Sequence, residues 1–90
     1  MIFAWDRRKA AANLKKHGVE FREAATVFSD PLSWTFPDEE HTEIEQRFLT
    51  IGQSAGRRLL IVAHTEEEDT IRIITARLAT RRERKFYEED

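Results

Sequence analysis

The sequence contains no cysteine, and only three glycines and two prolines among its 90 residues. Without cysteine the chain can form no disulfide, no thiolate nucleophile and no cysteine-ligated zinc site. Three scattered glycines cannot build a glycine-rich phosphate loop. No uncharged apolar run is longer than five residues, as in Leu59 to Ala63, whereas a membrane-spanning helix needs about 20. We therefore expect no membrane association, and the absence of a basic segment before an apolar stretch at the start predicts no secretion signal.

Apolar and charged residues are both plentiful. The chain is 40% hydrophobic and 36% charged, and its aromatic residues are two Trp, one Tyr and six Phe. This composition is sufficient for a packed core, and the length is that of one small domain. We expect residues 1–90 to form a single cytoplasmic domain.

Three helices are predicted from capping residues and apolar spacing. A first helix over about residues 6–17 is closed by Gly18, which can adopt the left-handed conformation that ends a helix. A second, shorter helix over about residues 21–28 must end before Pro31, because the residue before a proline avoids helical dihedral angles. The segment Thr80–Glu83 matches a capping box and predicts a final helix near the C-terminus.

The remaining apolar segments indicate β-strands. They lie at residues 2–5 (a short strand or an extended arm), 32–36, 46–53, 58–65 and 70–77. The segment 58–65 is the most apolar and β-branched, so we place it in the interior of the sheet, and the short connections predict antiparallel neighbours. The predicted class is α+β: a mainly antiparallel sheet of four to five strands in a two-layer fold. Two N-terminal helices and one C-terminal helix are expected to bury their apolar stripes on one face of the sheet.

The charges are unevenly distributed. Residues 31–70 are strongly acidic, whereas residues 1–30 and 71–90 each carry a small basic excess. Basic ends on a mildly acidic chain can form a local phosphate-binding patch. The alternative is that these charges simply solvate helix surfaces.

Arginine is concentrated on the last strand and the last helix: Arg72, Arg77, Arg81, Arg82 and Arg84. A guanidinium group binds two phosphate oxygens at once and keeps its charge at neutral pH. Strict alternation along a strand places Arg72 and Arg77 on opposite faces, so both can serve one site only if the strand ends or bulges between them. In the alternative interpretation Arg72 lies on a solvated face, paired with an acid such as Glu45.

Other side chains have a chemical and a structural interpretation. His17 can act as a general acid or base, or interact with the negative end of its helix. Tyr87 can stack on a base or polarise a phosphate, or seal its helix against the core. Trp5 and Trp34 suit packing, although exposed tryptophans stack on bases in nucleic-acid-binding proteins. His17, His41 and His64 are widely separated without supporting carboxylates, so no metal site and no cofactor are expected.

A series of short segments carries a family pattern in order and at normal spacing over almost the whole chain: Phe3–Asp6, Lys9, Asn13, Lys16–Val19, Phe21–Ala24, Val27–Pro31, Arg47–Gly52, His64–Glu66, Ile71–Arg77 and Thr80–Glu88. No single segment is diagnostic. Together they resemble the BrnT family of small bacterial proteins.

The resemblance implies a ribonuclease toxin of a type II toxin–antitoxin system with a RelE-like fold. Such toxins cleave RNA without a metal, by attack of the ribose 2′-hydroxyl on the adjacent phosphate, and thereby inhibit translation and growth. The implied partners are the RNA substrate and a BrnA-like antitoxin. Operator DNA is implied as a partner only of the toxin–antitoxin complex, which represses its own operon.

Applied to this chain, the resemblance leads to hypotheses about individual residues. Arg72 and Arg77 are expected to contact the scissile phosphate, and Arg47 and Arg81 to steer the RNA backbone. Lys9, His17, Glu83 and Tyr87 are candidates for proton transfer or substrate positioning, and His64 is a candidate for substrate binding. We expect a segment of the antitoxin to lie against the sheet or its flanking helices and to occlude Arg72 or Arg77.

Two alternatives belong to other classes. A non-catalytic module could use its basic face to bind a protein or a nucleic acid. The second predicted helix carries only Arg22 as a base-reaching donor, which is poor for a recognition helix. A purely structural interaction domain would need none of the arginines for activity.

Overall fold

The structure is a computed structural model that describes residues 1–41 and 45–89. In chain order its elements are β1 (Ile2–Ala4), α1 (Arg7–His17), α2 (Phe21–Thr26), η1 (Val27–Ser29), β2 (Trp34–Pro37), η2 (Glu39–His41), β3 (Phe48–Gln53), β4 (Leu59–Glu67), β5 (Thr70–Leu78) and α3 (Arg81–Glu88). This order confirms the predicted helices and strands, and adds the two short 3₁₀ helices η1 and η2. No helix in the described ranges is long and apolar enough to cross a membrane.

The helix ends follow local sequence signals. The Asp6 carboxylate accepts hydrogen bonds from the backbone N–H groups of Arg8 and Lys9, at 2.8 and 3.1 Å. Gly18 ends α1 with φ at 70°, a left-handed conformation that glycine adopts without strain. Helix α3 begins with the predicted reciprocal capping box of Thr80 and Glu83.

The five strands form one sheet in the order β1-β5-β4-β3-β2. Strand β4 lies at its centre, as predicted from its apolar run. Strands β2 to β5 pair antiparallel with their sequence neighbours. Strand β1 pairs with β5 in parallel, an arrangement made possible because α1 and the following elements carry the chain back across the sheet.

Strand β5 contains an irregularity in its pairing with β4. Ala63 pairs with Thr75, whereas the next residue, His64, pairs with Ile73. Ile74 is therefore an extra residue on β5, a β-bulge. A bulge breaks the alternation of side chains, so residues on its two sides exchange faces relative to an uninterrupted strand.

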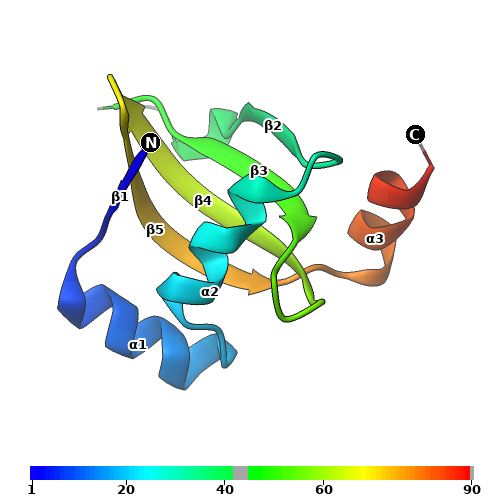
Figure 1. The fold of residues 1–90 in the computed structure, drawn as a ribbon, viewed down its shortest axis with the longest axis horizontal. Helices are drawn as coiled ribbons and strands as arrows, with labels where there is room; N and C mark the ends of the chain where they lie inside the picture. Colours follow the sequence, from blue (N-terminus) through cyan, green and yellow to red (C-terminus); the bar gives the residue numbers. More distant parts are fainter. Residues whose placement is uncertain (42–44, 90) are drawn as a thin grey trace.

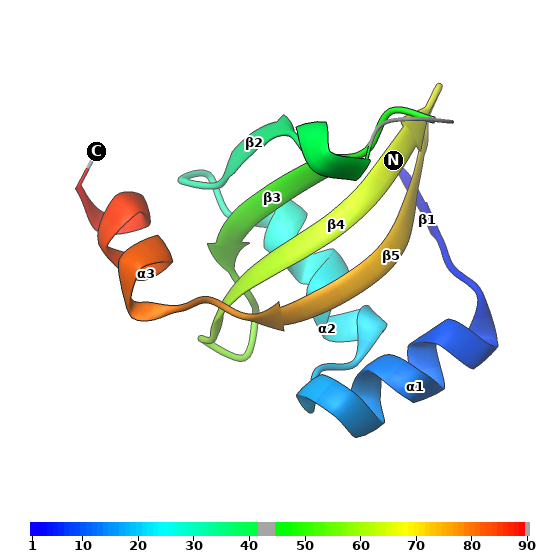
Figure 2. The ribbon, with the colours of Figure 1, turned by 180° about the vertical axis from the view of Figure 1, so that it is seen from behind.

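The helices lie on both sides of the sheet (Figures 1 and 2). Helices α1 and α2 cover one side, here called the helix face, which carries Leu60, Val62, Ile73 and Ala76 in the main core cluster. The other side, here called the open face, carries Leu49, Ile51, Leu59 and Ile61. Helix α3 packs on the open face through Tyr87. The expectation that all three helices bury their stripes on one face is thus wrong for α3, because β4 presents apolar side chains on both faces.

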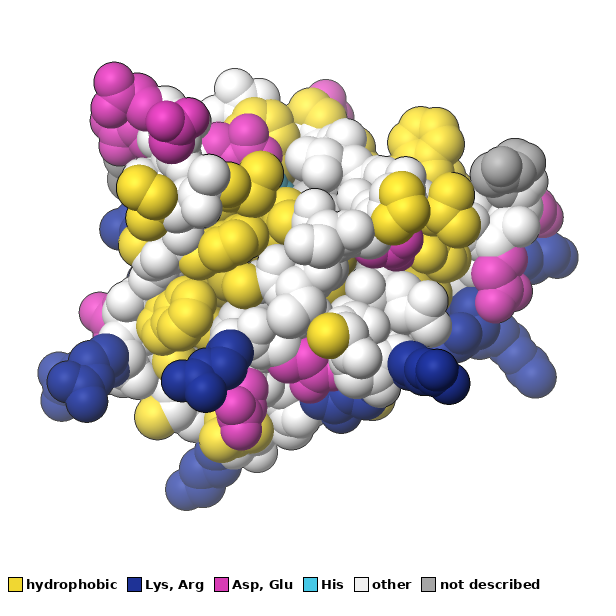
Figure 3. Space-filling model, in the orientation of Figure 1, with side chains coloured by type: hydrophobic (Ala, Val, Ile, Leu, Met, Phe, Trp, Pro, Cys, Tyr) yellow, Lys and Arg dark blue, Asp and Glu magenta, His cyan; other side chains and the backbone are white. Residues whose placement is uncertain are grey.

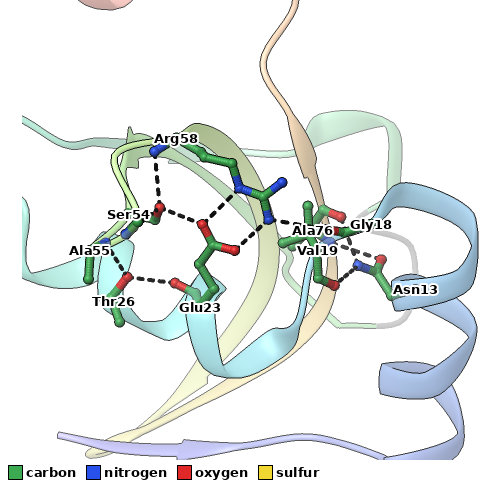
Figure 4. A network of polar contacts seen from close by, with 10 residues as sticks. Asn13, Gly18, Val19, Glu23, Thr26, Ser54, Ala55, Arg58 and Ala76 are labelled. Carbon is green, nitrogen blue, oxygen red and sulfur yellow. Dashed lines mark hydrogen bonds and ion pairs between the residues drawn. The ribbon is translucent and has the colours of Figure 1, made fainter.

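Two polar networks join the helices to the sheet (Figure 4). Arg58 donates to both carboxylate oxygens of Glu23, and Ser54 donates to the same carboxylate at 2.7 Å. This network ties α2 to the β3–β4 hairpin. The hydrogen bond from Arg58 is the main reason that the pKa of Glu23 is lowered.

The second network centres on the buried Asn13 of α1. Its amide nitrogen donates to the carbonyl oxygens of Val19 and Ala76, at 3.0 and 2.8 Å, and its oxygen accepts from the N–H of Ala76 at 3.1 Å. The side chain of Asn13 thereby pairs with the edge of β5 beyond the end of β1, as a further strand would.

We expect Asn13→Ala to lower the free energy of unfolding by about 2 kcal/mol, because it leaves the buried N–H and C=O of Ala76 without partners. Chemical denaturation followed by circular dichroism measures the change. Lys15→Ala on the exposed side of the same helix is the matched control, with little expected effect. A native-like stability for Asn13→Ala would contradict this role.

Candidate active site

The bulge in β5 brings the two arginines of that strand to the same side of the sheet. Arg72 pairs with Thr65 and Arg77 with Ile61. Cross-strand partners share a face, and Ile61 and Thr65 share a face because they are four residues apart on an uninterrupted strand. Arg72 and Arg77 therefore both lie on the open face, so the bulge that a joint role of the two arginines requires is present.

Each of these arginines binds a glutamate. The guanidinium of Arg72 donates to Glu45 at 3.1 Å, and the two side chains are 54% and 46% exposed. An ion pair this exposed contributes at most about 1 kcal/mol to stability. Phosphate oxygens can replace such a carboxylate at little cost, since they accept the same hydrogen bonds.

The second pair is tighter. Arg77 binds Glu83 with two parallel hydrogen bonds of 2.8 and 2.9 Å, and it also donates to the carbonyl of Leu78 at 3.2 Å. The hydrogen bonds from Arg77 are the main reason that the pKa of Glu83 is lowered to about 2, and the same contact raises the pKa of Arg77. Glu83 is therefore ionised and a weak base at neutral pH.

A shallow hollow of about 300 Å³ lies where α1 meets β5. Its lining includes Lys9, Lys16 and His17 from α1 and Thr75 from β5. Lys9, Lys16 and Thr75 are exposed and His17 is half-buried. Figure 3 shows Lys and Arg side chains projecting around α1.

Thr75 connects the hollow with the open face. It pairs with Ala63, which lies midway between the partners of Arg72 and Arg77 on β4, so Thr75 lies between the two arginines on the same face. Thr75 thus adjoins the two guanidinium groups on the open face and, at the edge of β5, the hollow that contains Lys9 and His17. Such a surface can bind a phosphodiester, stabilise charge that develops on it and exchange protons with it.

His64 lies outside this surface. Its ring is fully buried on the helix face, between the rings of Phe28 and Phe48, and its Nε2 lies 2.7 Å from Oγ1 of Thr50. This position corrects the expectation that His64 binds substrate, because a side chain without exposed surface cannot touch RNA. Burial is the main reason that the pKa of His64 is lowered to about 4.

Tyr87 lies towards the β2 side of the open face. Its hydroxyl donates to the Asp30 carboxylate, which also accepts from the backbone N–H groups of Leu32 and Gln53. Burial and the hydrogen bond to Asp30 raise the pKa of Tyr87 to about 12. The phenol therefore stays protonated at neutral pH and connects α3 to the loop before β2.

The two arginines expected to steer RNA are in different environments. Arg81 is exposed on the first turn of α3. Arg47 is half-buried just before β3, and its carbonyl oxygen accepts a hydrogen bond from the N–H of Asp38. Neither lines the hollow beside Thr75.

Sequence reasoning did not select Thr75 and Lys16 as site residues. Thr75 directly follows the bulge at Ile74 in β5, and Lys16 lies two turns after Lys9 on α1, on the same side of that helix. The signal for that bulge was present in the sequence, since two adjacent isoleucines, Ile73 and Ile74, interrupt the alternation of a half-buried strand. Both are buried in the structure.

Residues 1–41 and 45–89 contain no group of three or more His, Cys, Asp or Glu side chains placed to hold a metal ion. The charged groups around Thr75 are instead cationic, apart from the two glutamates that bind Arg72 and Arg77.

Comparison with known proteins identifies the family. The family model of the BrnT ribonuclease toxins of type II toxin–antitoxin systems matches residues 5–83. The chain belongs to the BrnT family. A search of curated proteins finds no significant sequence match. The crystal structure of the ribonuclease toxin BrnT from Brucella abortus is similar in fold, with a TM-score of 0.68 and 24% sequence identity over 90% of this chain and 100% of that one.

Membership of the BrnT family confirms the α+β, RelE-like fold inferred from the sequence, and places the chain among the ribonuclease toxins that act with an antitoxin. The matched range 5–83 includes α1 and the whole of β5, and therefore every residue around Thr75 described above.

Proposed function

We propose that this BrnT-family chain is an endoribonuclease that cleaves RNA without a divalent metal ion, at the surface formed by β5 and α1. The observation that carries the proposal is the bulge at Ile74, which sets Arg72 and Arg77 on one face with Thr75 between them. The same threonine lines the hollow that contains Lys9 and His17. Cleavage of cellular RNA there would inhibit translation and arrest growth.

The chemistry is an internal transfer of the phosphoryl group. A base removes the proton of the ribose 2′-hydroxyl, the 2′-oxygen forms a bond to phosphorus, and the bond from phosphorus to the 5′-oxygen breaks. An acid donates a proton to the departing 5′-oxygen, so the products carry a 2′,3′-cyclic phosphate and a 5′-hydroxyl. Arg72 and Arg77 would stabilise the charge on the phosphate oxygens, and His17 and Lys9 are the groups proposed for proton transfer.

Glu83 and Tyr87 are better suited to positioning than to proton transfer. Glu83 holds the guanidinium of Arg77 with two hydrogen bonds and caps α3. A carboxyl group with a pKa of about 2 has little affinity for a proton at neutral pH. Tyr87 retains its proton and binds Asp30 on the far side of the open face. For Arg47 and Arg81 we propose contacts with the RNA backbone away from the reacting phosphate.

The antitoxin is proposed to inhibit by covering this surface. Both arginines already bind carboxylates within the chain, so an acidic or amphipathic antitoxin segment can bind them in the same way. Operator DNA is proposed to bind only through the complex. Helix α2 supports this, because it has six residues, buries Phe21 and Ala24, and uses Glu23 to bind Arg58.

Expression in a bacterial host tests the proposal. We expect induction of the chain alone to arrest growth and co-expression with its cognate antitoxin to restore it. The purified complex should not cleave RNA, since substrate and antitoxin compete for one surface. A complex that cleaves as fast as the free chain would contradict occlusion, and unimpaired growth with soluble, folded protein would contradict the toxin activity itself.

A further inference from the structure

An exposed aromatic cluster lies at the edge of the open face farthest from β5. It consists of Trp34 and Phe36 of β2 and Phe86 of α3, which are 51%, 37% and 51% exposed. The ring of Phe86 packs edge-on at 6.0 Å from that of Trp34 and 6.3 Å from that of Phe36. Figure 3 shows hydrophobic side chains gathered between α3 and the neighbouring loop before β2.

The cluster adjoins a hollow of about 620 Å³ that Trp34 lines together with residues 31–33 and with Tyr87 and Glu88 of α3. Exposure of these aromatic rings to water is unfavourable, and their faces can pack against a flat apolar group in the hollow.

The strand register connects this cluster with the proposed active site. Trp34 pairs with Ile51, Ile51 with Ile61, and Ile61 with Arg77, so one row of partners crosses the open face from the tryptophan to the arginine. The middle of the row is buried, because Tyr87 of α3 packs on Ile51 and Ile61, so only its two ends are open to a ligand. The next row runs from Phe36 to Thr75 in the same way. Three strand spacings of about 4.8 Å separate the ends of each row, about 14 Å in all.

We propose that the aromatic cluster of Trp34, Phe36 and Phe86 is a nucleobase-stacking subsite for the single-stranded RNA whose phosphate lies near Arg72 and Arg77. This inference rests on the proposed function. Stacking on aromatic rings requires unpaired bases and tolerates any sequence, so the subsite selects single-stranded RNA rather than one base.

The alternation of flat rings and anionic groups, rather than charge alone, favours RNA over a protein segment as the occupant, because Glu88 also lines the hollow beside Trp34. The row that begins at Trp34 ends at the guanidinium group of Arg77. The row that begins at Phe36 ends at Thr75, which lies between the two arginines of β5. A nucleotide chain joins apolar bases to anionic phosphates at each step, and so it matches a surface with aromatic rings at one side and cations at the other.

The test uses binding rather than cleavage, so that it is independent of catalysis. The probe is an end-labelled 2′-O-methyl RNA octamer of mixed sequence, which lacks the attacking hydroxyl. We expect Trp34→Ala to weaken its binding between about 5-fold and about 150-fold, and Trp34→Phe to restore most of the affinity. The same octamer with abasic positions should bind native protein and Trp34→Ala equally, because it has no base to stack.

Tryptophan fluorescence gives a second readout, because the chain has two tryptophans. In Trp5→Phe the remaining Trp34 should be quenched by the octamer, whereas in Trp34→Phe the remaining Trp5, which packs on Phe21, should not respond. Unchanged affinity for Trp34→Ala together with unquenched Trp34 would overturn the subsite, even if RNA cleavage is confirmed. Loss of antitoxin binding without loss of octamer binding would assign the cluster to the antitoxin instead, and would equally overturn it.

Discussion

Arg72→Gln and Arg77→Gln are each expected to slow RNA cleavage by about 100-fold or more, the usual loss when one donor to a developing oxyanion is removed. Glutamine keeps a hydrogen-bond donor, on a shorter side chain, but carries no charge. The effect should therefore fall on the rate constant for cleavage in single-turnover experiments, and expression of either variant alone should no longer arrest growth.

A matched control separates this effect from a general loss of positive charge. Arg57 is exposed in the β3–β4 turn, where it has a φ of 65°. Arg57→Asn removes one charge and retains a residue that tolerates this backbone conformation, so it should cleave at the native rate. Equal loss of cleavage in Arg57→Asn and Arg72→Gln would show that total charge, rather than the site on β5, determines the rate.

The two arginine variants should differ in stability. Arg72 and Glu45 form an exposed pair, so Arg72→Gln should unfold like native protein. Arg77→Gln removes the partner of Glu83, which is also the capping residue of α3, and should be modestly less stable. Loss of activity in a fully stable Arg72→Gln is thus the clearer evidence for a role with substrate.

His64 is expected to make the fold sensitive to acid. Its pKa is lowered from 6.5 to about 4 by burial, an effect that the Thr65 backbone only partly offsets. Between these two values the unfolded chain binds a proton that the folded chain does not, so stability falls as the pH is lowered. The full loss, reached below pH 4, is about 3–4 kcal/mol, since each unit of pKa corresponds to about 1.4 kcal/mol.

The test compares native protein with His64→Gln, which can still bond to Thr50 but does not titrate. Free energies of unfolding from urea titrations should decline more steeply for native protein than for the variant between pH 6.5 and pH 4.5. The carboxylates of Glu23, Asp30 and Glu83, whose pKa values are lowered in the folded chain, also stabilise the fold. Their contribution is lost only at lower pH, because these groups ordinarily titrate at 4.5 or below. Parallel curves in this window would contradict a neutral, buried His64.

The sequence predicted those parts of the fold that depend on neighbours along the chain. Gly18 and the pair of Thr80 and Glu83 define helix ends through contacts within a few residues, and the apolar run of β4 implies a central strand whatever the topology. The location of α3 on the open face depends on Tyr87 reaching Asp30, 57 residues away in sequence. No local pattern encodes that contact.

The candidate site was only partly predictable for the same reason. The arginine content of β5 and α3 was visible, and the adjacent Ile73 and Ile74 interrupt the alternation, but only the pairing with β4 fixes the position of the bulge and hence the face of each arginine. His64 was misassigned because a histidine in an apolar strand has the same local sequence whether it is exposed or buried. Its burial is set by Phe28 and Phe48, which come from other elements.

The chemistry of the cleaved ends, measured in excess EDTA, most directly tests whether the side chains around Thr75 carry the reaction. RNA incubated with purified free protein and chelator should still be cut, with a 2′,3′-cyclic phosphate on the upstream fragment and a 5′-hydroxyl on the downstream one. Arg72→Gln protein prepared in parallel should leave the RNA intact, which excludes a contaminating nuclease. Cleavage that stops in EDTA and returns with magnesium, or fragments with 5′-phosphate ends, would contradict the mechanism.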